Sequence, residues 1–185
     1  MSNIFMSKPS GKDRILKPDC SEGDSSGRFA VKRLNESDVD TILHLCKGNA
    51  LFYEYHPPLA TRESILEDMS ALPPHKTYRD KYYVGFYEAD LLVAVLDLIL
   101  NYPQEGTAYI GFFMVDASCQ GQGLGSHIVQ GIADCLKKKE FVKIRLAIDE
   151  GNPQSEAFWT KNGFKKTGER YPGDASAYLP MEREL

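Results

Sequence analysis

The chain has 185 residues and a mass of 20.8 kDa, which suits a single domain. It holds 22 Lys and Arg residues against 26 Asp and Glu residues, and this net charge of −4 argues against a general nucleic-acid-binding protein. The longest apolar run, residues 91–100, is too short to cross a bilayer. No secretory signal is visible, so we expect a cytoplasmic monomer or homodimer that binds neither nucleic acid nor membranes.

The N-terminal segment differs in composition from the rest of the chain. Residues 1–27 are rich in Ser, Gly, Lys, Asp and Pro and show no hydrophobic periodicity. Such composition is typical of unpacked chain, so we expect a mobile extension before one domain at residues 28–185. Residues 28–33 then begin that domain as a predicted strand.

Two helices are predicted next. Residues 37–40 resemble a capping box, and the helix that follows them should end at Gly48. Thr61 can cap a second helix, which should end before Pro73. An aromatic segment with two prolines, residues 52–58, connects these two helices.

The second half of the chain alternates strands and helices. Two apolar segments joined by two residues predict a hairpin, a third strand follows, and apolar residues at helical spacing then predict a helix. Asn152 and Pro153 begin a further helix that ends at Asn162. The predicted strands of this half lie at residues 82–88, 91–100, 107–115, 142–148, 164–171 and 177–185. The predicted helix that follows the third of these strands spans residues 123–139. This order predicts an α/β domain with a mixed seven-stranded sheet, about four helices and one right-handed parallel crossover.

The most informative segment leaves the strand that ends at Val115 and enters a helix through Gly121, Gly123 and Gly125. Alternating glycines let the backbone approach a ligand closely, and a helix N-terminus presents unpaired N–H groups that suit a phosphate or pyrophosphate. The structural alternative is a tight turn that requires positive φ. Neither a P-loop nor a dinucleotide-binding fingerprint is present.

Two segments together resemble the GNAT superfamily of N-acetyltransferases. Gln120-Gly-Gln-Gly-Leu-Gly125 matches the Gln/Arg-x-x-Gly-x-Gly/Ala signature of that family. Residues 152–164, Asn-Pro-Gln-Ser-Glu-Ala-Phe-Trp-Thr-Lys-Asn-Gly-Phe, are similar to its Asn…Ala…(Leu/Phe)-Tyr-x-Lys-x-Gly-Phe block. The resemblance extends from about Arg28 to the end of the chain. It implies a GNAT fold, in which two neighbouring parallel strands splay apart and form the acetyl-CoA cleft.

The resemblance implies acetyl-CoA as co-substrate. The sequence contains no Cys/His cluster at metal-ligand spacing, so we expect no metal. The glycine turn would hold the pyrophosphate, the pantetheine arm would pair with the strand edge near Val115, and a backbone N–H there would polarise the thioester carbonyl. Asn152 would contact the coenzyme arm and also cap its helix. The expected cofactor-binding residues are Met114, Val115, Gln120, Gly121, Gln122, Gly123, Leu124, Gly125, Ser126, Asn152 and Lys161.

The implied reaction is direct attack of a primary amine on acetyl-CoA in a ternary complex. A lysine-like amine has a pKa near 10.4, so its deprotonation at pH 7 costs about 4–5 kcal/mol and calls for a base. Asp97 is a candidate base, as a lone carboxylate in an apolar strand, or else a hydrogen-bonded structural residue. Trp159 stands where the family usually has a tyrosine that reprotonates the thiolate. Indole can donate a hydrogen bond but cannot supply that proton, so either Tyr171 or Tyr178 supplies it or the thiolate leaves with only hydrogen-bond help. Trp159 itself is then a catalytic hydrogen-bond donor or a packing residue.

The acceptor is predicted only as a small-molecule or peptide amine. Tyr53, Tyr55 and His56 occupy the region that shapes the acceptor site in this family, although an aromatic segment can also simply cover the core. Trp159 and the lack of an evident base leave an alternative function open. In that alternative the protein is a catalytically weak acyl-CoA-binding module.

Overall fold

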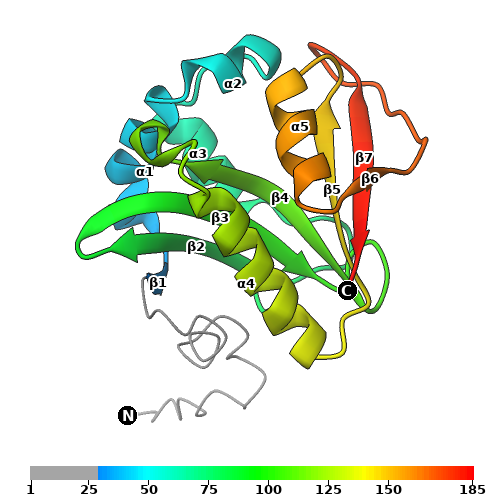
Figure 1. Ribbon diagram of the computed structural model, residues 1–185. Helices are drawn as coiled ribbons and strands as arrows, with labels where there is room; N and C mark the ends of the chain where they lie inside the picture. The colour runs from blue at the N-terminus through cyan, green and yellow to red at the C-terminus, as the bar shows by residue number, and fades with distance from the viewer. Residues whose placement is uncertain (1–28) are drawn as a thin grey trace, which may run out of the picture.

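The computed structural model describes residues 29–185, so the predicted mobile extension at residues 1–27 lies outside the described residues. The chain forms one mixed sheet of seven strands, in the order β1-β2-β3-β4-β5-β7-β6, with helices on both faces (Figure 1). The strands are β1 (Ala30–Arg33), β2 (Lys81–Glu88), β3 (Leu91–Leu100), β4 (Thr107–Val115), β5 (Lys143–Asp149), β6 (Lys165–Lys166) and β7 (Tyr178–Glu184). The helices are α1 (Val39–Lys47), α2 (Ala50–Tyr55), α3 (Arg62–Ser70), α4 (Leu124–Lys138) and α5 (Pro153–Lys161), with short 3-10 helices η3 (Glu36–Asp38) and η4 (Ala117–Cys119).

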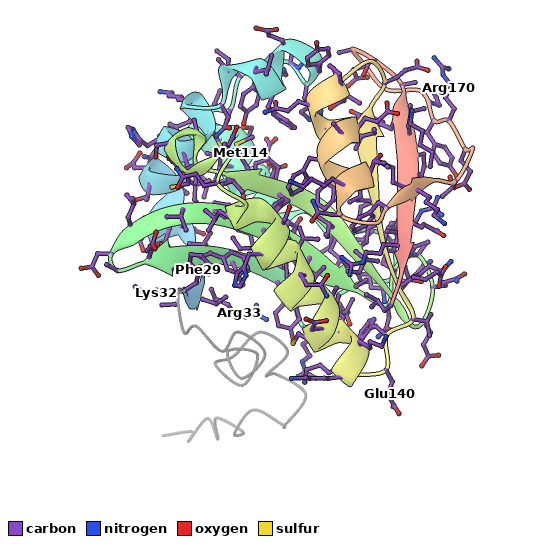
Figure 2. All side chains as sticks on the ribbon, viewed as in Figure 1. Phe29, Lys32, Arg33, Met114, Glu140 and Arg170 are labelled. Atoms are coloured by element: carbon purple, nitrogen blue, oxygen red, sulfur yellow. The ribbon has the colours of Figure 1, made fainter. Side chains whose placement is uncertain are left out.

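Strands β4 and β5 are parallel neighbours that separate along their length. They pair only from Thr107–Tyr109 to Lys143–Arg145 and then diverge, so that they form a V (Figure 1). Met114 lies on the side of the molecule where the two strands are apart, and Glu140, after α4, lies where they meet (Figure 2). The predicted fold class, with its splayed parallel strands, is confirmed.

Alternating side chains of the sheet build two cores. On one face Val84, Leu96 and Ile144 pack with the apolar stripe of α4 and with α5. On the other face Tyr83 and Val95 pack with α1 and α3. The two-residue period of each strand therefore gives both faces an apolar surface, and each face is covered by helices. Within residues 29–185, no helix is both long and apolar enough to cross a membrane.

Two elements differ from the sequence prediction. The first part of the aromatic segment belongs to a fifth helix, α2, which ends at Tyr55. Phe52 of this helix packs edge-on against Phe112 of β4. This tertiary contact outweighs the low helix propensity of aromatic residues. The strand predicted at residues 164–171 is reduced to β6 and one isolated bridge, because Gly168 has a positive φ of 88° that interrupts the ladder.

Candidate active site in the cleft between β4 and β5

The divergence of β4 and β5 opens a cleft of about 880 Å³. Its walls are the outer halves of both strands, its floor includes the turn into α4, and α5 and the end of α2 contribute further side chains. Strand pairing stops beyond Tyr109 and Arg145, which leaves the backbone edge of β4 without a β5 partner along residues 110–115. An extended ligand can therefore add to that edge as a strand would.

The glycine turn presents backbone to the cleft. Gly121 and Gly123 have positive φ values of 74° and 82°, and no heavy atom lies within 4 Å of the position that a Cβ would take at either residue. Gly123 is the N-cap of α4, so the amides of the first helical turn that follows it have no carbonyl partner within the helix. Unpaired amides and the positive end of the helix dipole meet here at open space, which is the chemistry of an anion site.

Two side-chain amides fix this turn to the end of β4. The Nε2 group of Gln120 donates to Oδ1 of Asn49 at 2.6 Å and to the carbonyl of Val115 at 3.0 Å. The buried Asn49 in turn donates to the same carbonyl at 3.2 Å. Gln122 does not line the cleft, because its side chain donates to the Ser118 carbonyl instead. The glutamines therefore shape the turn with their side chains, and the glycines leave its backbone accessible.

Helix α5 forms the facing wall. The buried side chain of Asn152 caps this helix by accepting from the Ser155 amide at 3.0 Å, and the residue also lines the cleft. Lys161 lies at the other end of α5, exposed at the cleft margin. The predicted residues that line the cleft are Met114, Val115, Gln120, Gly121, Gly123, Leu124, Gly125, Ser126, Asn152, Lys161, His56 and Trp159.

Trp159 is a packed wall of the cleft. Only 7% of the residue is exposed, and the rings of Phe113, Phe158 and Phe164 lie with centroids 5.8, 4.9 and 5.0 Å from its own. Three ring contacts in edge-on or tilted geometry stabilise the junction between α5 and β4. This surrounding favours the packing interpretation of Trp159.

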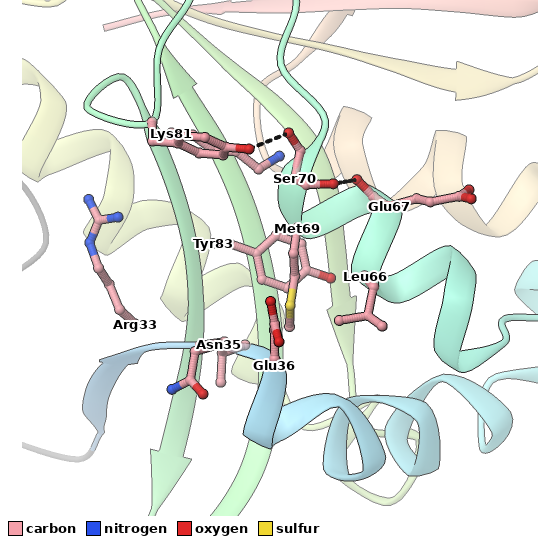
Figure 3. A pocket seen from close by; sticks show the side chains of 11 residues that line it. Arg33, Asn35, Glu36, Leu66, Glu67, Met69, Ser70, Lys81 and Tyr83 are labelled. Atoms are coloured by element: carbon pink, nitrogen blue, oxygen red, sulfur yellow. Dashed lines mark hydrogen bonds between the residues drawn. The ribbon is translucent and has the colours of Figure 1, made fainter.

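Asp97 lies in a different environment. Its Oδ2 atom accepts from the Lys81 ammonium at 2.7 Å, both side chains are buried, and Asp97 is not among the residues that line the cleft. Burial raises the pKa of the Asp97 carboxyl, and the charge of Lys81 opposes that rise. Lys81 borders a second hollow of about 610 Å³ between the end of β1 and α3, where Figure 3 shows it beside Tyr83. Asp97 is thus held in an ion pair behind the cleft, which is the structural alternative for this residue.

Of the three predicted acceptor residues, one lines the cleft and two do not. Tyr53 faces α1, where burial and a hydrogen bond with Cys46 raise the pKa of its hydroxyl, and neither Tyr53 nor Tyr55 lines the cleft. His56, just beyond α2, does line it. Its Nδ1 atom lies 3.1 and 3.2 Å from the two carboxylate oxygens of Asp149, and its ring lies 6.3 Å from that of Tyr178.

Sequence reasoning did not identify Asp149 as a site residue. It is the last residue of β5, and polar residues at the carboxyl end of a parallel strand commonly face a ligand site, so this signal was available. Tyr178 of β7 also lines the cleft, and burial together with Asp149 and Asp174 raises the pKa of its phenol. Arg145 lines the cleft as well, but Glu169 and Glu182 hold its guanidinium.

Comparison with known proteins assigns the family. The family model described as "Acetyltransferase (GNAT) family" matches residues 48–164, which include the cleft strands, the glycine turn and α5. The chain belongs to the GNAT acetyltransferase family. The predicted resemblance is thus confirmed, and the protein falls in the acyltransferase class of enzymes. A sequence search among curated proteins finds no significant match.

Solved GNAT structures share the fold at low sequence identity. An acetyltransferase from Thermus thermophilus superposes with a TM-score of 0.69 at 18% identity, covering 85% of this chain and 97% of that one. The PaiA N-acetyltransferase of Thermoplasma acidophilum, solved in complex with coenzyme A, gives 0.63 at 17%, covering 85% and 99%. The ribosomal-protein-S18-alanine N-acetyltransferase of Escherichia coli gives 0.62 at 15%, covering 85% and 94%.

The GNAT cleft of this chain also offers no metal centre among residues 29–185, where no three His, Cys, Asp or Glu side chains converge. The residues present fit acetyl-CoA instead. The glycine turn provides unpaired amides facing open space, and it adjoins the free edge of β4 in the same cleft that Asp149 and His56 line.

Proposed function

We propose that this protein transfers the acetyl group of acetyl-CoA to a primary amine by direct attack in a ternary complex. One observation carries the proposal: a single cleft joins an anion site at the N-terminus of α4 to a pair of ionisable side chains, His56 and Asp149, at the end of β5. Coenzyme A carries a diphosphate and a thioester at opposite ends of an extended arm. The arrangement of the cleft matches that arrangement of charges.

The cofactor half acts mainly through backbone groups. The amides that follow Gly123 would hold the diphosphate, and the pantetheine arm would pair with the unpaired edge of β4 at residues 110–115. A backbone N–H near Met114 or Val115 would then stabilise the oxyanion that develops on the thioester carbonyl. When bound, acetyl-CoA supplies the activated acyl group, and the chain orients it.

The acceptor half is suited to an amine, whether a small molecule or a peptide N-terminus. Phe52, Phe112 and Tyr109 provide apolar walls, and Asp149 is a buried carboxylate. An acceptor that arrives as an ammonium must lose a proton before its nitrogen can attack. Tyr178 also lines the cleft and is a candidate proton donor for the departing thiolate; burial and the nearby Asp149 and Asp174 raise the pKa of its phenol, which therefore keeps its proton at neutral pH.

A weak acyl-CoA-binding module is not favoured as the alternative, since the chain belongs to a family of acetyltransferases. Two measurements test the proposal. Calorimetry should show CoA binding, and a panel of spermidine, lysine and an Ala-initiated peptide should include at least one amine that increases CoA release above hydrolysis. Tight CoA binding without any amine-dependent release from a broad panel would contradict the transferase and support the module. Absence of CoA binding would contradict both.

A further inference from the structure

We propose that His56 is the general base that deprotonates the acceptor amine and that Asp149 is the residue that positions it. The inference rests on the proposed function and assigns a role that the function requires. Its starting point is the pairing of Nδ1 with both oxygens of the Asp149 carboxylate at 3.1 and 3.2 Å. Both residues line the cleft: His56 directly follows α2, and Asp149 is the last residue of β5.

The pairing fixes which ring nitrogen can act. A carboxylate only accepts hydrogen bonds, so Nδ1 of His56 must be the donor in this contact. In the neutral ring the proton then resides on Nδ1, and Nε2 keeps its lone pair. A histidine in this tautomer presents a proton acceptor on the far side of the ring from its carboxylate. Asp149 therefore holds His56 in the tautomer that can accept a proton at Nε2.

The different burial of His56 and Asp149 fits their different roles. The side chain of Asp149 is 9% exposed and that of His56 is 44% exposed. A shielded carboxylate interacts strongly with a charge that forms on the imidazole, because little water competes for it. The half-exposed ring can still reach an acceptor and pass its proton to solvent. This division suits a base that is protonated and deprotonated in every turnover.

Further groups surround His56 from α2, α3 and β7. Asp68 of α3 is the second carboxylate that interacts electrostatically with the ring, and Tyr178 of β7 faces it as an uncharged phenol. The remaining contact is the apolar ring of Phe52, at 5.2 Å between centroids. Lys81 also interacts with Asp68, and burial raises the pKa of Asp68, so Asp149 is the carboxylate that contacts the ring of His56 directly. Asp97 has no such freedom, because Lys81 already holds its carboxylate.

The proposed reaction balances in protons and electrons. The acceptor arrives as an ammonium and gives one proton to Nε2 of His56. The nitrogen lone pair then attacks the thioester carbonyl, so that a C–N bond forms, and the C–S bond breaks as the electron pair leaves with sulfur. The nitrogen loses its second proton as the amide forms, and the thiolate gains one. His56 returns its proton to water.

The test compares His56→Ala with His44→Ala, an exposed histidine on α1 that does not line the cleft. On the amine that the wild-type protein uses best, His56→Ala should lower kcat about 100-fold, added imidazole should recover about tenfold of that loss, and CoA affinity should be retained. His44→Ala should behave as wild type. His56→Gln, which can still donate to Asp149, should be as slow as His56→Ala, and this second variant controls for folding.

The pH profile separates a base from a structural residue. The wild-type rate should show one downward step toward acidic pH, because a protonated base cannot accept the proton of the amine. In His56→Ala that step should vanish, and the rate should rise about tenfold per pH unit as the amine deprotonates by itself. Asp149→Asn should lower kcat by about 10- to 100-fold with the KM for the amine unchanged.

Each outcome decides the inference. Retention of most of the wild-type kcat in His56→Ala, or no recovery with imidazole, would overturn the role of His56 while leaving the proposed function intact. A raised KM with unchanged kcat in Asp149→Asn would make Asp149 an ammonium-binding residue instead. If the wild-type protein itself transfers no acetyl group, the proposed function fails and this inference fails with it.

Discussion

The two ends of the cleft are built in different ways. The end at the glycine turn comes from one continuous segment, residues 115–126, and presents backbone amides. The end at His56 gathers side chains from α2, β5 and β7, and its central pair is separated by 93 residues in the chain. The proposed cofactor site is thus encoded locally, whereas the proposed acceptor end forms only once the sheet is complete. Variants at each end should therefore fail in different ways.

The largest effect is expected at the glycine turn. Asn tolerates the left-handed conformation of Gly123, and its side chain would occupy the open space where we place the diphosphate. Gly123→Asn should weaken CoA binding about 100-fold, or about 2.7 kcal/mol, in calorimetry. The matched control is Gly168→Asn, at a φ of 88° with equally open surroundings outside the cleft lining. Equal affinity of both variants and the wild type would refute the placement of the diphosphate.

Trp159 tests whether the cofactor end contributes proton transfer as well as binding. Replacing a packed indole by a smaller ring should cost about 1–2 kcal/mol in urea denaturation, for Trp159→Phe and Trp159→Tyr alike. Because we interpret Trp159 as a packing residue, the two variants should also have the same kcat. A Tyr variant about tenfold faster than the Phe variant would instead show that position 159 can supply a proton to the thiolate.

Asn152 combines a helix cap with a place in the cleft. Asn152→Ala should lower the free energy of unfolding by about 1 kcal/mol, because it removes the acceptor of the Ser155 amide. Asn152→Asp keeps that acceptor and should keep the stability, yet it removes the side-chain amide donor and should weaken CoA binding about tenfold, or about 1.4 kcal/mol. Unchanged affinity in Asn152→Asp would confine this residue to capping.

The smallest effect concerns the ion pairs between β5 and β7, which hold Arg145 in the cleft wall. Burial alone would raise the pKa of Glu182, but the hydrogen bonds from Lys143 and Arg145 lower it overall. A lowered folded-state pKa stabilises the protein above the unfolded-state value, and this stabilisation is lost as the pH falls through the folded-state value. Glu182→Gln should therefore cost about 1 kcal/mol at neutral pH and progressively less below about pH 4.

Glu184→Gln is the control for that network. Glu184 also lies near Lys143, at 3.5 Å, but its side chain is 76% exposed. Exposed ion pairs contribute little because water and salt screen them, so this variant should match the wild-type protein at every pH. A Glu182→Gln protein with wild-type stability at neutral pH would show that β5 and β7 do not depend on these charges.

Much of the fold was predictable because its signals are local. The hairpin of β2 and β3, the strand β4 and the caps of α3 and α5 follow from periodicity and from turn and capping residues. Helix α2 was not predicted, since its stability depends on contacts such as that of Phe52 with β4. The placement of β7 between β5 and β6 is likewise a tertiary outcome.

The candidate site divides in the same way. The glycine turn was predicted from one short motif, but the contact of His56 with Asp149 requires the folded sheet. Asp97 is isolated in the sequence prediction because the predicted hairpin strand begins one residue after Lys81. In the observed register Asp97 pairs with Tyr83, which places Lys81 diagonally across the hairpin from it. The two-residue turn by itself would pair Lys81 with Leu98 and leave Asp97 on the other face of the sheet. The bulge between Phe86 and Tyr87 shifts the register by one residue and brings Lys81 and Asp97 to the same face, so the hairpin pattern alone does not predict this ion pair.

The crystal structure of the wild-type protein with coenzyme A tests the central claim most directly. We expect density for the diphosphate against the amides of residues 120–126, with the arm along the free edge of β4 and the thiol near Val115. The sulfur should then face the part of the cleft that His56 and Asp149 line. Coenzyme A bound in the hollow beside Lys81, or anywhere other than between β4 and β5, would contradict the account.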